Sequence, residues 1–243
     1  MSIMSTKVKA YKKENPCSYA LGASITIELI NTRPEIVREV NIHSAYRGKM
    51  DLTELCQRKN IPVSFSDKAF NIVSPKENCF VFGVVEKYID AISPDKPHIV
   101  LVNPSDMGNL GTIIRTMAGM NYKNLAIIEP AADIWNPKTI RAAMGGLFHI
   151  NFELFSDFSD YKAKFPGHRL FPFMLNGTTV PEDAEKCEKN SLIFGNEAHG
   201  LDKSFLQVGT SIKIPFSPDI DSFNLAVAAG IGMYIFSRKN GMI

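Results

Sequence analysis

Apolar and polar positions alternate differently on the two sides of one proline-rich segment. Residues 92–97 read Ile-Ser-Pro-Asp-Lys-Pro, and the prolines at 94 and 97 interrupt helical and extended patterns alike. We therefore expect a linker at this segment, between a first domain over residues 1–92 and a second over residues 97–243.

Behind the linker, short apolar runs alternate with segments that have helical spacing. This alternation predicts a mostly parallel sheet with helices on both faces, an α/β fold. Ligands of such sheets bind outside the carboxyl ends of the strands, so the chemistry is expected in the loops that follow them. The expected strands are 98–102, 124–128, 150–155, 169–175, 191–194 and 211–215.

Ahead of the linker, the pattern predicts a smaller α/β module. Helices are expected at 20–30 and 52–58, and extended segments at 36–42, 61–65 and 78–85. Several basic side chains of this module fall at positions expected to be exposed, where they meet either solvent or phosphates. They are Arg33, Arg38, Arg47, Lys49, Arg58 and Lys59.

Composition and charge narrow the function classes. The chain has 243 residues, 45% of them hydrophobic and 21% charged, which is typical of a folded protein. Its net charge of +2 argues against a protein that holds nucleic acid through bulk charge alone. No apolar run reaches the roughly twenty residues of a membrane span, and no signal peptide is recognised, so we expect a cytoplasmic protein. The 4 cysteines and 5 histidines lack metal-ligand spacing, and we expect no metal site.

Loops after several expected strands share one composition. Each combines glycine or proline with Asn, Ser, Asp or Glu, as expected where backbone approaches a ligand and side chains form hydrogen bonds. Because these loops would lie at one edge of the sheet, together they predict a binding site. The loops are 103–111, 176–177, 195–200 and 215–224.

The first of these loops is expected to open a helix at 112–120, whose N-terminus can hold an anion or a polar ligand. It lacks the GK[ST] of a P-loop and the GxGxxG of a dinucleotide fold, so nucleotide hydrolysis is disfavoured. Arg115 lies about 100° round this helix from Ile114. It either faces the loop cleft or lies on the surface or in a salt bridge.

Other loop residues also have two readings each. Glu197 belongs to a site or is a carboxylate stabilised by a helix N-terminus. Ser222 belongs to a site or caps the final helix, a role for which Asp221 is a rival. Small residues four apart in that final helix fit either a tight crossing within the chain or a dimer interface.

Three segments, in order, resemble the motifs of the SpoU/TrmH family of SPOUT RNA methyltransferases. They are Gly-Asn-Leu-Gly-Thr-Ile-Ile-Arg at 108–115, Phe-Gly-Asn-Glu-Ala-His-Gly-Leu at 194–201, and Ile-Pro-Phe at 214–216 followed by Ser-Phe-Asn-Leu-Ala-Val-Ala at 222–228. The resemblance covers about residues 97–240. More loosely, the first module resembles the substrate-binding domain, related to a ribosomal protein fold, that often precedes this catalytic domain.

The resemblance implies a dimeric α/β domain with a trefoil knot that binds S-adenosylmethionine and methylates a ribose 2′-hydroxyl in rRNA or tRNA. The catalytic positions that it implies are Asn109, Arg115, Glu197, Ser222 and Asn224. The cofactor-binding positions that it implies are Leu175, Asn176, Gly195, Ile214 and Phe223. Departures from the family pattern are Phe223, where leucine is common, and Phe216, where methionine is common.

In the implied mechanism, Arg115 binds RNA phosphate or stabilises developing oxyanion charge, because a guanidinium is effectively always protonated. Glu197 orients Arg115 or lines the cleft, while Asn109, Ser222 and Asn224 position the ribose and the loop backbone. Two other functions stay open. One is an RNA-binding or ribosome-assembly protein with little activity, and the other is a base-directed RNA methyltransferase.

Overall fold

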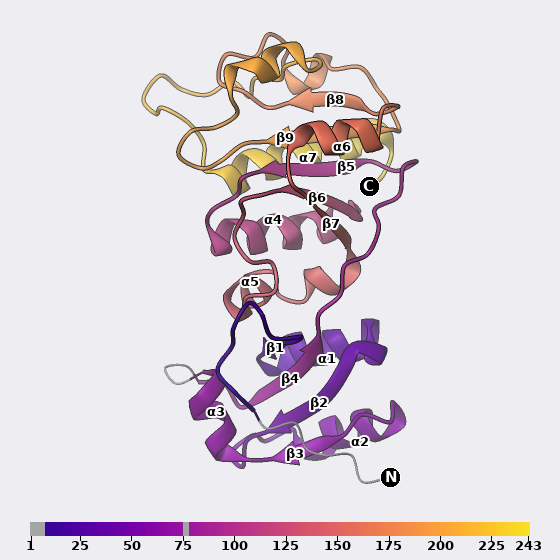
Figure 1. The fold of residues 1–243 in the computed structure, drawn as a ribbon, viewed down its shortest axis with the longest axis vertical. Coiled ribbons are helices and arrows are strands. Elements are labelled where there is room, and N and C mark those ends of the chain that lie inside the picture. The colour runs from indigo at the N-terminus through magenta and orange to yellow at the C-terminus, as the bar shows by residue number, and fades with distance from the viewer. Residues whose placement is uncertain (1–7, 75–77) are drawn as a thin grey trace. The chain divides into compact units, whose positions relative to one another are not determined.

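A computed structural model describes residues 8–74 and 78–243 of the chain. The chain divides into two compact units (Figure 1). Unit 1 comprises Met1–Tyr88 and Asp133–Phe148, and unit 2 comprises Ile89–Ala132 and His149–Ile243. Unit 1 therefore includes a segment that lies, in the sequence, between two strands of unit 2. The prolines expected to mark a linker fall inside unit 2, where the neighbouring Ile92 is buried in the core.

Unit 1 contains a four-stranded sheet in the order β1-β4-β2-β3. Strand β4 pairs antiparallel with β1 and β2, and β3 joins the edge of β2 in parallel. The strands are β1 (Cys17–Leu21), β2 (Val37–Ile42), β3 (Val63–Phe65) and β4 (Val81–Glu86). The helices are α1 (Ala23–Thr32), α2 (Lys49–Arg58), α3 (Asp67–Val73) and α5 (Pro137–Ala142).

The predicted helix at 20–30 was wrong at its start, because its first residues belong to β1. Gly22 separates strand from helix with a φ of 107°, a conformation that favours glycine. Strand β1 was missed because its apolar residues run directly into those of α1. The short helix α3 was missed as well, and it packs Phe70 against Phe82 of β4 with ring centroids 4.9 Å apart.

Unit 2 contains a five-stranded sheet in the order β7-β6-β5-β9-β8, and every pairing is parallel. This confirms the predicted parallel α/β sheet. The predicted strand at 211–215 was wrong. Ile212 forms only isolated bridges, to Phe173 and Thr179, because both of these residues lie in the loop that follows β8 and not in a strand. The strands are β5 (His98–Val102), β6 (Asn124–Ile128), β7 (Asn151–Phe155), β8 (Arg169–Pro172) and β9 (Asn190–Phe194).

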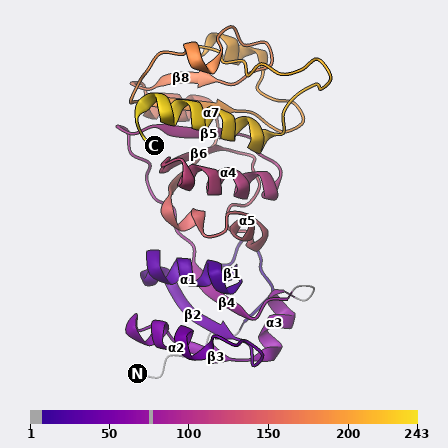
Figure 2. The ribbon, with the colours of Figure 1, turned by 180° about the vertical axis from the view of Figure 1, so that it is seen from behind.

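Helices cover both faces of this sheet. Helix α6 (Phe158–Lys164) lies on one face, and α4 (Met107–Gly119) and α7 (Leu225–Asn240) pack side by side on the other (Figures 1 and 2). Alternate strand residues point to opposite faces. Accordingly, Val100 and Ile193 join Tyr161 of α6 in one buried cluster. No helix among the described residues is both long and apolar enough to span a bilayer.

The small residues of α7 allow a tight crossing within the chain. A Cβ at Gly232 would lie 2.7 Å from the ring of Phe173, so a side chain there would push α7 away from the end of β8. One turn further on, the ring of Phe236 packs 4.9 Å from that of Phe171. At Gly232 the small residue thus serves packing inside unit 2.

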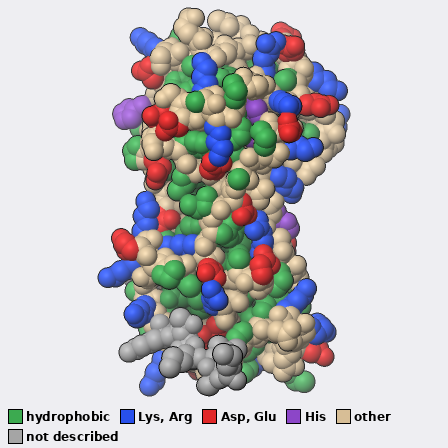
Figure 3. Space-filling model, turned by 45° about the vertical axis from the view of Figure 1, so that its right-hand side comes forward, with side chains coloured by type: hydrophobic (Ala, Val, Ile, Leu, Met, Phe, Trp, Pro, Cys, Tyr) green, Lys and Arg blue, Asp and Glu red, His purple; other side chains and the backbone are tan. Residues whose placement is uncertain are grey.

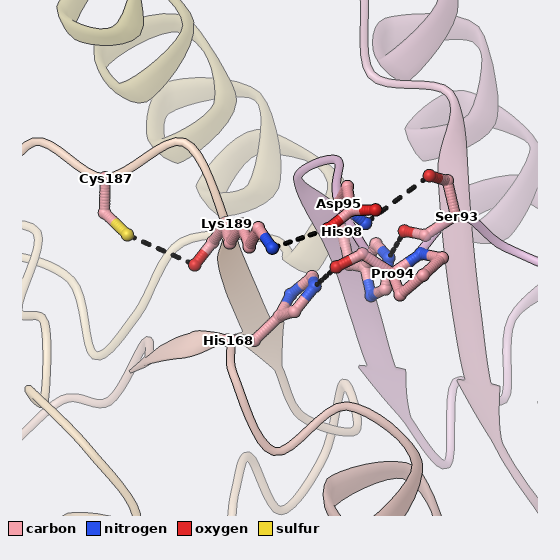
Figure 4. A network of polar contacts seen from close by, with 7 residues as sticks. All are labelled: Ser93, Pro94, Asp95, His98, His168, Cys187 and Lys189. Carbon is pink, nitrogen blue, oxygen red and sulfur yellow. Dashed lines mark hydrogen bonds and ion pairs between the residues drawn. The ribbon is translucent and has the colours of Figure 1, made fainter.

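A polar network joins elements at the amino ends of the strands (Figure 4). His98, the first residue of β5, lies 2.8 Å through Nε2 from the carbonyl oxygen of Ser93 and 2.9 Å through Nδ1 from the Tyr161 hydroxyl. His168 lies 3.0 Å through Nε2 from the carbonyl oxygen of Pro94. Burial lowers the pKa of both imidazoles, that of His98 to about 4. We assign this network to the stability of unit 2, because it lies at the amino ends of the strands, whereas the loops with candidate chemistry lie at their carboxyl ends.

Candidate active site

The loops after β5 and β9 meet at the carboxyl edge of the unit 2 sheet. From β5 the chain continues to β6 and β7 on one side, whereas β9 and β8 lie on the other side. Parallel strands whose connections diverge in this way leave a crevice at their carboxyl ends. At this crevice the loops after β5 and β9 are joined to each other by hydrogen bonds.

A cavity of about 460 Å³ is lined by the loops after β8 and β9 and by the segment that leads into α7. This volume is within the range of roughly 300–1,000 Å³ typical of small-molecule sites. It contains all the predicted cofactor-binding positions and part of the predicted catalytic set. The predicted residues that line it are Leu175, Asn176, Gly195, Glu197, Ile214, Ser222 and Phe223.

The loop after β9 is a closed turn that presents Glu197. The backbone N–H groups of Asn196 and Gly200 each donate to the carbonyl oxygen of the other, over 3.2 and 2.9 Å. A Cβ at Gly195 would lie 2.2 Å from the carbonyl carbon of Gly200, so only glycine permits this closure. The Asn196 side chain also donates over 2.8 Å to the carbonyl oxygen of Asn103, which joins this loop to the loop after β5.

The Glu197 carboxylate lies at the N-terminus of α4. Its Oε2 accepts from the backbone N–H and the hydroxyl of Ser105, over 3.0 and 2.8 Å, and its Oε1 accepts from the Asp106 N–H over 3.1 Å. Burial raises the pKa of this carboxyl, but the hydrogen bonds outweigh it and hold the pKa below its usual range. Glu197 is therefore ionised and already accepts several hydrogen bonds, which makes it a poor general base.

Two asparagines continue from this carboxylate to α7. The Asn109 amide donates over 3.3 Å to Glu197 Oε1, and its oxygen accepts over 3.0 Å from the Asn224 amide. The Asn224 oxygen accepts in turn from the backbone N–H of Ala226 over 2.8 Å. We call Glu197, Asn109 and Asn224 the amide relay.

The relay corrects two sequence predictions. Helix α4 begins at Met107 and not at 112, because the Asp106 side chain caps it by accepting from the Asn109 N–H over 2.7 Å. Asn109 is thus in the first helical turn. The predicted caps of the final helix, Ser222 and Asp221, were wrong: α7 begins at Leu225, and the residue directly before it, Asn224, is the cap.

Three predicted catalytic residues do not line the cavity: Asn109 and Asn224, which are joined to Glu197 by hydrogen bonds, and Arg115, which is not. Arg115 is exposed on α4, and among the described residues that line the cavity it does not appear. Of the two predicted roles of Glu197, lining the cleft is observed, whereas no hydrogen bond or ion pair to Arg115 is found within the described part of the chain. A single copy of the chain therefore presents the carboxylate, the amides and Ser222 without the guanidinium.

Sequence reasoning missed Ser105 and Asn196 as site residues. Both lie inside the loops that were singled out, but periodicity gives no sign that a residue after β5 bonds a residue after β9. The rings of Phe216 and Phe223, the two departures from the family pattern, lie at the cavity with centroids 5.8 Å apart and edges toward faces. No group of His, Cys, Asp and Glu side chains within residues 8–74 and 78–243 is arranged to hold a metal ion.

Comparison with known proteins identifies the family of the chain. Residues 96–234 match the SpoU rRNA Methylase family. The 23S rRNA (guanosine(2553)-2′-O)-methyltransferase RlmP of Bacillus subtilis is 27% identical over 245 residues, covering 96% of each chain. The tRNA (cytidine(34)-2′-O)-methyltransferase of Escherichia coli K12 is 33% identical over 150 residues, 59% of this chain and 94% of that protein.

Solved structures share the fold. The SpoU methyltransferase AviRb from Streptomyces viridochromogenes superposes with a TM-score of 0.80 at 19% identity, covering 93% of this chain and 91% of that one. The AdoMet-bound rRNA methyltransferase from Sinorhizobium meliloti gives 0.79 at 22% identity, with 92% and 87% covered. Since the family match spans more than half of the chain and includes every loop of the cavity, this protein belongs to the SpoU rRNA methylase family.

Proposed function

We propose that this protein transfers the methyl group of S-adenosylmethionine to a ribose 2′-hydroxyl of ribosomal RNA. The observation that carries the proposal is that the second and third motif segments line one cavity at the carboxyl ends of the strands, while Asn109 of the first motif is joined to them by hydrogen bonds to Glu197 and Asn224. Ribosomal RNA is favoured because the Bacillus subtilis relative, named for 23S rRNA, aligns over 96% of both chains. The relative named for tRNA matches only 59% of this chain.

The cavity residues fit S-adenosylmethionine. Its volume of about 460 Å³ suits a ligand of this size, and the edge-to-face rings of Phe216 and Phe223 offer apolar walls. The ionised Glu197 places a negative charge at the cavity, which favours a ligand that carries a sulfonium cation. The loops at Gly195 and Ile214 would hold it, and when bound it supplies an electrophilic methyl group.

The chain's own residues position the sugar oxygen and stabilise charge. Ser222 is exposed at the cavity and can hydrogen-bond the ribose. Glu197 is engaged with donors, and a guanidinium group has no lone pair to accept a proton, so neither Glu197 nor Arg115 removes the hydroxyl proton. Arg115 stabilises the charge that develops on the oxygen, and the proton passes to RNA phosphate or water.

We also propose that the protein acts as a homodimer. Arg115 is exposed and lies outside the cavity of its own chain, while α7, next to α4, exposes Val227 at 49% and Tyr234 at 50%. Apolar side chains on a helix face, beside a guanidinium that the site needs, support packing against a second copy of the same chain. In this arrangement each copy completes the cavity of the other with its Arg115.

We also propose that unit 1 recognises the RNA. On the face shown in Figure 3, Lys and Arg are interspersed with Asp and Glu, so we expect individual phosphate contacts and not a continuous basic surface. Arg33, Arg38 and Arg58 interact with an aromatic ring or a carboxylate within the unit. Arg47 and Lys59 are exposed and are the stronger candidates for phosphate contacts.

The test is methyl transfer to ribosomal RNA from S-adenosylmethionine with a labelled methyl group, followed by alkaline and nuclease digestion. A 2′-O-methyl group blocks cleavage at the modified nucleotide, so the label should remain in an uncleaved dinucleotide. Arg115→Ala should bind S-adenosylmethionine in calorimetry yet lose transfer by orders of magnitude. Arg169→Ala, an exposed arginine of β8 paired with Glu185, is the matched control and should stay active. Label found on a base would favour the base-directed alternative, and cofactor binding without transfer to any RNA would favour a binding protein.

A further inference from the structure

Ser105 makes a double contact with Glu197. Its backbone N–H donates to Oε2 over 3.0 Å, and its hydroxyl donates to the same oxygen over 2.8 Å. The two residues are 92 positions apart in the chain, one after β5 and the other after β9. Ser105 is itself exposed and is outside the residues that line the cavity, so it reaches the site through Glu197 and through Asn196, whose side-chain amide donates to its hydroxyl over 3.4 Å.

The contacts of Glu197 fix the direction of the amide relay. An ionised carboxylate only accepts hydrogen bonds, so Asn109 must turn its NH₂ group toward Glu197 and its oxygen toward Asn224. At the other end, the backbone N–H groups of α7 only donate, so Asn224 must turn its oxygen toward them and its NH₂ group toward Asn109. Both amides therefore have a single orientation that satisfies every contact.

This direction depends on the protonation state of Glu197. A protonated carboxyl carries an O–H, which would face a donor at whichever oxygen held it, since Ser105, Asp106 and Asn109 surround both oxygens. The Ser105 hydroxyl opposes this protonation, because the hydrogen bond that it donates to Oε2 stabilises the charged form. Other titratable groups near this carboxyl are Asp106 at the start of α4 and His199 and Lys203 at the cavity.

We propose that Ser105 is a positioning residue of the methyl-transfer site, which keeps Glu197 as the acceptor end of the amide relay and so holds the loops after β5 and β9 and the start of α7 in one arrangement. This inference rests on the proposed methyl transfer for its kinetic consequence. Its structural consequence, the state of Glu197, can be measured without cofactor or RNA.

The experiment compares Ser105→Ala with the unchanged protein in two measurements. Carbon-detected NMR of the Glu197 carboxyl in the protein alone should show its titration midpoint at higher pH in Ser105→Ala, because one donor to the charged form is gone. In methyl-transfer assays, kcat at neutral pH should fall about tenfold while the KM for S-adenosylmethionine changes little. The acid limb of the kcat profile should move to higher pH together with the NMR midpoint.

Two further variants separate positioning from folding. Ser105→Thr keeps the hydroxyl and should restore the midpoint and most of kcat. Ser159→Ala is the matched control, because Ser159 also donates its hydroxyl to a carboxylate at a helix N-terminus, that of Asp157 at the start of α6. It should leave both measurements unchanged.

In Ser105→Ala, an unshifted Glu197 midpoint or an unchanged kcat profile would overturn the inference. If Ser105→Ala shifted the midpoint but the unchanged protein methylated no RNA, the proposed function alone would be removed.

Discussion

Glu197→Gln tests whether this residue acts through charge and accepted hydrogen bonds. The substitution is isosteric, but it replaces one acceptor oxygen with an NH₂ group. Oε1 accepts from Asp106 and Asn109, and Oε2 accepts from Ser105, so the new NH₂ group faces a donor in either orientation. Each hydrogen bond to a charged group contributes about 1.5–3 kcal/mol. Because the carboxylate is partly exposed, we take the lower end and expect a total loss of about 3 kcal/mol for two bonds.

This loss should appear in stability, and urea unfolding followed by circular dichroism should report it as destabilisation of unit 2. In methyl-transfer assays kcat should also fall, by about tenfold or more, because the loops that position the ribose lose the acceptor end of the amide relay. Glu197→Ala should be no worse than Glu197→Gln. The reasoning would be refuted if Glu197→Gln unfolded and turned over like the unchanged protein, or if Glu188→Gln, an exposed control in the same unit, showed the same loss.

Four further outcomes are expected. Arg115→Ala and Ser222→Ala should each be inactive alone, but a heterodimer of the two variants should regain activity, because one site keeps both residues. If coexpressed and isolated heterodimers showed no activity, a site shared between two copies would be refuted. Asn224→Ala should lower stability by about 1 kcal/mol in urea unfolding, whereas Asn224→Ser keeps a cap for α7 and should recover stability but not kcat. Arg47→Ala should weaken RNA binding and flatten its dependence on salt in filter-binding assays, and an unchanged slope would remove this phosphate contact. Burial lowers the pKa of His98 to about 4, so below about pH 6.5 the folded state binds fewer protons than the unfolded state. The free energy of unfolding should therefore fall by about 3 kcal/mol between pH 6.5 and 4. In denaturation series at several pH values, His98→Gln should flatten this slope.

The parallel sheet could be predicted from sequence because its strands are buried on both faces. The runs at 98–102 and 124–128, each apolar after its first residue, match strands β5 and β6 at both ends. The segment at 211–215 has only two isoleucines that alternate with Ser and Lys, a pattern that also fits a strand, but its bridge partners lie outside the named strands. Strand β1 failed for another reason, since its five residues merge into the helix that follows Gly22.

The site was predicted as a set of residues but not as a set of contacts. Loop composition and the family motifs together identified Glu197, Asn109 and Asn224, and the structure joins them. Their roles depended on where helices begin, which sequence patterns place only to within a few residues. Once α4 begins at Met107 and α7 at Leu225, Asn109 falls in a first turn and Asn224 becomes a cap. Ser105 lies in a loop that was singled out, but its contact with Glu197 could not be predicted, because the two residues are 92 positions apart.

The two ends of β5 and β9 respond to pH in different ranges, and this separates folding from catalysis. At the amino ends, burial keeps His98 neutral, and its stabilising contribution is lost as the pH falls from about 6.5 toward 4. At the carboxyl ends, hydrogen bonds hold the pKa of Glu197 below its usual range, so its charge persists through most of that interval. Mild acid should therefore reduce stability before it disturbs the amide relay. If activity fell in this range while the protein remained folded, and Ser105→Ala did not move that fall, a group other than Glu197 would control the acid limb.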